Sequence, residues 1–144
     1  MWEDLDRLIE ERQNWRLLRR RRNQKVAERC AIGWKNLSEA LHREIIRHNT
    51  LGKKPKLGIR RSKDRLDIHR INHLSPLLSF VLDDDNVQIL SCAPIYAGST
   101  TLSERGKILA AFLGTVLIVD PDGRMVRFGY EQAAQVLLAP ILNH

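Results

Sequence analysis

Cysteine is scarce in this sequence. The 144 residues include two cysteines, Cys30 and Cys92, which are far apart and lie in apolar stretches. This pattern favours buried free thiols over a disulfide, and it argues against a secreted domain held together by several disulfides. A reducing compartment fits such a chain best, so we expect a cytoplasmic protein.

Long apolar runs are missing as well. No run approaches the roughly 20 residues that a membrane-spanning helix needs. Residues 1–6 are acidic and lack the apolar core of a secretory signal. We therefore expect neither a membrane span nor export.

Recognisable catalytic motifs are also absent. The sequence has no nucleophile elbow, phosphate-binding loop, dinucleotide fingerprint or pair of catalytic carboxylates. His69 and His73 are four residues apart, but they fall in or just after a predicted strand and have no third ligand at a suggestive spacing. The acidic residues 83–85 and 120–122 lack the spacing of a calcium loop and are typical of hairpin turns. We expect no enzymatic activity, no cofactor and no metal.

Helix-breaking residues are rare near the front of the chain. Residues 2–48 contain no proline and a single glycine, Gly33. On a helical wheel of about 100° per residue, one apolar stripe centred on Leu5 predicts a long amphipathic helix. The stripe consists of Leu5, Leu8, Ile9, Val26, Cys30, Trp34, Leu37, Leu41 and Ile45.

The middle of this stretch breaks the apolar pattern. The same stripe also contains Arg12, Arg16, Arg19 and Asn23. Burying guanidinium groups without partners is costly, so this part cannot simply lie on a core. Either the helix projects past the globular body, or the chain breaks near Asn23 into two helices. We favour the projecting helix, because residues 11–28 contain no strong helix terminator.

Positive charge is concentrated in one half of the chain. Residues 1–70 carry 20 Lys and Arg against 10 Asp and Glu, giving +10. Residues 71–144 carry 4 against 7, giving −3, and the two halves sum to the net charge of +7. A polyanion or an acidic partner would therefore dock on the front half.

Short alternating segments separated by turn residues follow the helix and predict antiparallel hairpins. The expected strands are residues 56–61, 65–70, 77–82, 87–92, 115–119 and 124–128. Residues 107–112 are ambiguous between strand and short helix, and we favour a strand. Residues 93–106 are expected to form a loop.

A second helix is expected at the end of the chain, over residues 130–139. Its apolar face contains Ala134, Leu137, Leu138 and Ile141. Pro140 is expected to kink or stop this helix, because proline lacks the backbone donor that a helix interior needs.

This order of elements predicts an α+β fold. A long N-terminal helix, an antiparallel meander of five or six strands and a short C-terminal helix would form a two-layer sandwich. We expect a single domain, residues 1–144, made of a basic helical arm (residues 1–25) and a globular body (residues 26–144). Both helices should cover one sheet face, which leaves the other face solvated or available for binding.

The densest basic segment is residues 12–25, in which seven of fourteen residues are Lys or Arg and none is acidic. On a helix this segment spans about 20 Å, enough to follow several backbone phosphates, and guanidinium groups suit phosphate geometry. We therefore predict a small non-enzymatic protein that binds nucleic acid. The predicted contact residues are Arg12, Arg16, Arg19, Arg20, Arg21, Arg22 and Lys25, with Lys53, Lys54, Lys56, Arg60 and Arg61 extending the charge into the body.

Apolar residues flank these arginines and support an alternative. If the arm projects, they are exposed and need a partner. The alternative is an interaction or assembly subunit, either a homodimer or part of a larger complex, that docks through the long helix. The predicted interface residues are Trp2, Leu5, Leu8, Ile9, Trp15 and Leu18.

Overall fold

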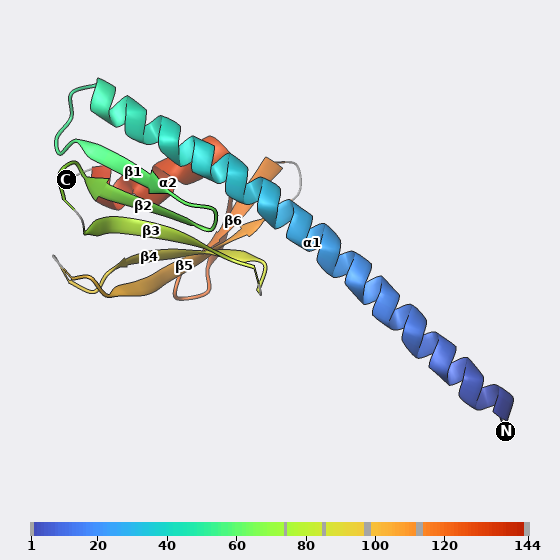
Figure 1. Cartoon of the computed structure of the whole chain (residues 1–144). Coiled ribbons are helices and arrows are strands. Elements are labelled where there is room, and N and C mark those ends of the chain that lie inside the picture. The colour runs from blue at the N-terminus through green and yellow to red at the C-terminus, as the bar shows by residue number, and fades with distance from the viewer. Residues whose placement is uncertain (1, 74, 85, 97–98, 112–113, 143–144) are drawn as a thin grey trace.

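The computed structural model describes residues 2–142 except 74, 85, 97–98 and 112–113, and the side chains of residues 2–3 and 14–23 are not among those described. One long helix, α1 (Trp2–Thr50), precedes seven strands and a C-terminal helix, α2 (Tyr130–Leu142) (Figure 1). The predicted α+β fold is confirmed. Within the described residues, neither helix is both long and apolar enough to cross a membrane.

The strands form one antiparallel sheet in which each strand pairs with its sequence neighbours, in the order β1 to β7. Their bounds are β1 (Leu57–Arg61), β2 (Arg65–Arg70), β3 (Pro76–Asp83), β4 (Gln88–Pro94), β5 (Leu102–Ala110), β6 (Thr115–Val119) and β7 (Met125–Gly129). The meander is confirmed, but the expected count of five or six strands was too low.

Strand β5 accounts for the main error in the sheet prediction. The loop expected over residues 93–106 is wrong at both ends. Residues 93–94 belong to β4, and residues 102–106 form the first half of β5. The register shifts after Ser91, which pairs with Gly106. A Cβ atom on Gly106 would lie only 2.8 Å from the carbonyl oxygen of Val119. This glycine therefore permits a close approach between strands at a bulge and does not mark a loop.

The turns between strands follow from local sequence. Ser62 N donates to the carbonyl oxygen of Arg65 at 2.8 Å and closes the β1–β2 turn. In the β6–β7 turn, the Asp120 carboxylate accepts a hydrogen bond from Arg124 N at 2.8 Å. Gly123 has a φ of 84° there, which glycine adopts without strain. The predicted hairpins are confirmed.

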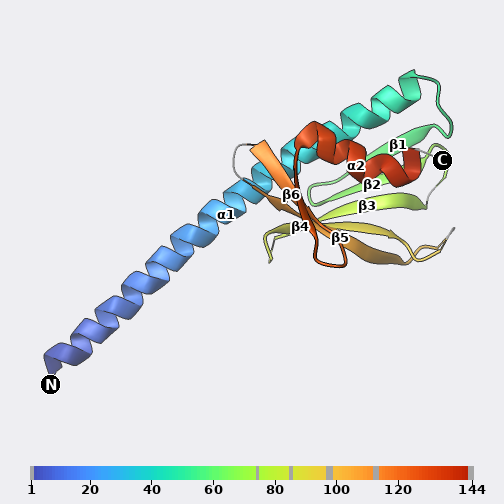
Figure 2. The same cartoon turned by 180° about the vertical axis from the view of Figure 1, so that it is seen from behind.

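Both helices cover the same face of the sheet, as expected (Figure 2). An ion pair of 2.9 Å between Arg43 of α1 and Glu131 of α2 links the two helices at the surface. The core between the helices and the sheet includes Leu37, Leu41, Ile45, Leu66, Ile68, Phe80, Ile89, Ile108, Val116, Ala134 and Leu138.

The buried stripe of α1 begins one turn later than the sequence suggests. The sequence pattern places Val26 on the packed stripe, but 41% of this residue is exposed. The first buried residue along α1, among those whose side chains are described, is Cys30, at 4%. Hence residues 24–28 are exposed and extend the projecting part of the helix.

Helix α2 continues past Pro140 to Leu142, so the expected stop does not occur. Proline at position 140 has no N–H to donate to the carbonyl of Val136. The helix tolerates this loss because Pro140 lies in its last turn. The predicted apolar face is confirmed, because Ala134 and Leu138 are buried.

Candidate nucleic-acid interface

Residues 2–25 of the arm (residues 1–25) form the first part of one unbroken helix. Figures 1 and 2 both show the N-terminal half of α1 extending away from the sheet. The break considered near Asn23 does not occur, and the projecting helix is the arrangement observed. All side chains described in residues 4–13 and 24–28 are exposed.

The predicted contact residues of the arm follow this helix. Arg12 and Lys25, at the two ends of the basic segment, are exposed. The side chains of the other predicted arm residues lie outside the described part, so only their backbone is placed on the helix. These residues are Arg16, Arg19, Arg20, Arg21 and Arg22, together with Trp2, Trp15 and Leu18 of the predicted partner interface.

The arm joins the body at Gly33 and Trp34. The indole nitrogen of Trp34 donates to the carbonyl oxygen of Lys63 at 3.1 Å, which fixes the β1–β2 turn against α1. A Cβ atom on Gly33 would lie 3.1 Å from the Cβ of Ala110 at the end of β5. Glycine thus allows α1 to pass close to the sheet at this point.

The basic loop after α1 lies far from the arginines of the arm. Lys53, Lys54 and Lys56 are exposed, as predicted. They follow the C-terminal end of α1, about 45 Å along the helix axis from residue 20 at 1.5 Å per residue. The structure therefore does not bring this loop and the arm together into one basic surface.

Side-chain hydrogen bonds hold the basic loop in place. Asn49 donates from Nδ2 to the carbonyl oxygen of Leu57 at 2.7 Å and accepts from Leu57 N at 3.0 Å. The ring Nε2 of His48 lies 2.8 Å from the carbonyl oxygen of Pro55. These contacts connect the end of α1 to the free edge of β1 and satisfy backbone groups that would otherwise be unpaired.

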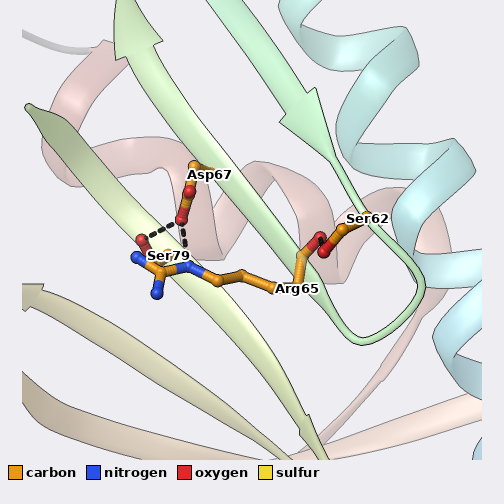
Figure 3. A network of polar contacts seen from close by, with 4 residues as sticks. All are labelled: Ser62, Arg65, Asp67 and Ser79. Atoms are coloured by element: carbon orange, nitrogen blue, oxygen red, sulfur yellow. Dashed lines mark hydrogen bonds and ion pairs between the residues drawn. The ribbon is translucent and has the colours of Figure 1, made fainter. Parts of the chain in front are cut away.

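The arginines of the first hairpin are divided between surfaces. Arg60 and Arg61 are exposed neighbours in β1, so the alternation of a strand directs them to opposite faces. Arg65 is an ion-pair partner of Asp67, with 2.8 Å between Nε and Oδ1. The same Oδ1 accepts from Ser79 Oγ at 2.5 Å, on the sheet face away from α2 (Figure 3). The positive charge of Arg65 is therefore paired with Asp67 within the sheet and adds little to a basic surface.

An acidic turn lies near the base of the arm, which sequence reasoning missed. Burial raises the pKa of the Cys30 thiol, and the nearby Asp84 and Asp83 raise it further. The β3–β4 turn is thus close to α1 at Cys30, although more than 50 residues separate them in sequence. This acidic turn therefore lies beside the part of α1 that follows the arm.

Other possible sites have little support. Both cysteines are free, and Cys92 is partly exposed, contrary to the expectation that each is buried. In the described part of the chain, no three His, Cys, Asp or Glu side chains are grouped as metal ligands would be. A hollow of about 270 Å³ lies between α1 and α2, lined by residues that include Arg47, His48 and Gln135.

Comparisons with protein-family models, with curated proteins and with solved structures gave no match to this chain.

Proposed function

We propose that this protein is a small, non-enzymatic, cytoplasmic nucleic-acid-binding protein that contacts phosphates through residues 12–25 of the arm. The observation that carries the proposal is the unbroken helix through this segment. Seven basic residues and no acidic residue follow it over about 20 Å, outside the body. Phosphate contacts of this kind are largely independent of nucleotide sequence.

The exposed ends of the segment support this proposal. Arg12 and Lys25 are surrounded by solvent, and no ion pair links either of them to a described carboxylate. A helix held only at its C-terminal half can lie along a nucleic acid without moving the body. Of the other basic groups, Arg61 and Lys63 at the β1–β2 turn are nearer to the arm than Lys53 and Lys54, because Trp34 holds that turn.

The test compares two variants of equal charge. Replacing Arg19, Arg20, Arg21 and Arg22 by Gln removes four positive charges from the arm. The control replaces four basic residues of α1 and the body outside the arm by Gln, also removing four charges: Lys35, Arg47, Arg105 and Arg124. Fluorescence anisotropy with a labelled DNA or RNA of about 20 nucleotides, at about 0.1 M salt, measures both affinities.

We expect the arm variant to bind at least about 100-fold more weakly, because each phosphate contact contributes strongly at this salt. The control variant should lose far less affinity. Circular dichroism should show that both variants are folded to the same extent. Equal losses in the two variants would mean that only total charge matters, and the arm would not be the site.

An assembly role is the second candidate. The specific observation in its favour is the exposure of Leu5, Leu8 and Ile9, at 53%, 56% and 48%. Three apolar side chains on one helix stripe in water are typical of a surface that a protein partner covers.

A further inference from the structure

The sheet face opposite the helices carries an apolar patch. Residues that pair across an antiparallel ladder share a face, so the register defines the patch. One row runs Val81, Leu90, Lys107, Val119 and Met125 from β3 to β7. The neighbouring row contains Leu109, Leu117 and Arg127. We call the six apolar residues of these rows the open-face patch: Val81, Leu90, Leu109, Leu117, Val119 and Met125.

None of these six residues belongs to the core that the helices cover. Five are partly exposed, and 62% of Met125 is exposed. The strands from β3 to β7 thus present apolar side chains on both faces, although α1 and α2 cover only one. A contiguous exposed patch of this kind marks an interaction surface.

The charged residues in the two rows that contain the patch are both basic. Lys107 lies in the row between Leu90 and Val119, and Arg127 lies beside Leu117. Both are exposed, and neither makes an ion pair with any residue that the structure describes. The carboxylates of Asp67 and Glu104 belong to a different row of the same face. A partner for the patch should therefore be apolar with acidic borders.

The first turns of the arm have this chemistry. Leu5, Leu8 and Ile9 form an exposed apolar stripe. At about 100° per residue, Asp4 and Glu11 border the stripe on one side, and Asp6 and Glu10 border it on the other. All four carboxylate residues are exposed. Residues 4–11 thus offer an apolar centre between two acidic edges.

Residues 4–11 of one chain cannot reach the open-face patch of the same chain. Leu8 lies about 33 Å along the helix axis from Cys30, the first buried side chain described on α1. The helix is unbroken, and Figures 1 and 2 show its N-terminus pointing away from the sheet. The occupant of the open-face patch must come from another molecule.

We propose that residues 4–11 of one copy dock on the open-face patch of a second copy. Leu5, Leu8 and Ile9 would cover the patch, and the acidic borders would lie near Lys107 and Arg127. If the exchange is reciprocal, a two-fold axis relates the copies and the assembly closes as a dimer. The basic segment, residues 12–25, then spans the space between two bodies. This inference concerns self-association and goes beyond phosphate binding.

A charge-exchange experiment tests the docking. The arm variant carries Asp6→Lys and Glu10→Lys, and the face variant carries Lys107→Glu and Arg127→Glu. A control variant carries Arg105→Glu and Arg124→Glu. Its net charge changes by the same amount as that of the face variant, but the substituted residues lie outside the patch. Sedimentation of nuclease-treated full-length protein gives the mass of each species, so bridging by nucleic acid cannot imitate a dimer.

Wild-type protein and control should sediment at twice the 16.7 kDa chain mass. The arm and face variants should each dissociate at least about ten times more readily, because like charges then meet at the interface. Mixed in equal amounts, the two variants should form a heterodimer, since each arm then faces a complementary patch. This rescue also shows that both variants are folded.

Three results would overturn the proposal. One is a monomeric wild-type protein at about 100 µM, a concentration at which even a weak dimer forms. Another is a dimer that the arm variant disrupts while the face variant does not, which would indicate pairing between two arms. The third is a mixture that stays monomeric. None of these results bears on phosphate binding, which is measured separately.

Discussion

Neighbouring residues on the open sheet face determine the pKa of the Cys92 thiol. Burial raises the pKa of its thiol above the ordinary value, Glu104 raises it further, and Arg65 acts in the opposite direction. A raised pKa leaves less thiolate at neutral pH, and the thiolate is the form that reacts. Cys92 is partly exposed, yet its environment does not activate it.

Alkylation of this thiol provides a prediction. In a Cys30→Ala background, iodoacetamide should modify Cys92 slowly at neutral pH, and the rate should rise as the pH increases toward the raised pKa. Glu104→Gln removes a negative neighbour, lowers the pKa and should increase the rate at neutral pH. Mass spectrometry measures the rates, with Asp122→Asn in the β6–β7 turn as the control. A Glu104→Gln rate no higher than that of the control would contradict this account.

At the scale of elements, the pairing of β5 with β6 depends on one glycine. Gly106 lies where the register of β4 and β5 shifts, and its missing side chain allows Val119 to approach. Gly129, at the end of β7, has no atom within 4 Å of a Cβ placed on it. Gly106 and Gly129 therefore differ in packing, so substitutions at these two positions can be compared directly.

Replacing Gly106 by Ala should lower the free energy of unfolding by about 1–3 kcal/mol, because the new methyl group clashes with backbone that cannot move freely. Gly129→Ala should change it by less than about 1 kcal/mol in either direction. Urea unfolding followed by circular dichroism measures both values. Similar values for the two variants would show that the close approach at Gly106 is unimportant for stability.

Elements set by local sequence could be predicted well. The turn residues Asp120 and Gly123 correctly predicted the last hairpin, and the lack of helix terminators correctly predicted an unbroken α1. Features set by distant contacts could not be predicted. Nothing local shows that Gly106 lies in a strand or that Asp84 comes close to Cys30. The same limit applies to the basic residues, because only the fold separates Lys53 and Lys54 from the arm.

At the scale of the whole molecule, charge and shape are arranged together. The arm carries its basic segment beyond the body, while the acidic turn of β3–β4 stays near its base. The open sheet face and the tip of the arm are both uncovered in one chain. A polyanion on residues 12–25 and a second copy on the tip use different parts of the same helix, so the two proposed interactions do not compete for one surface.

The decisive test of phosphate binding by the arm is the salt dependence of nucleic-acid affinity. If the seven basic residues of the segment contact phosphates of duplex DNA, the logarithm of the association constant should fall against the logarithm of salt concentration with a slope of about −6. Affinity should then drop by about 10³-fold or more between 50 and 200 mM salt. Anisotropy titrations of the full chain at four or five salt concentrations would give this slope. A slope shallower than about −1, or no binding at 50 mM salt, would contradict the proposed function.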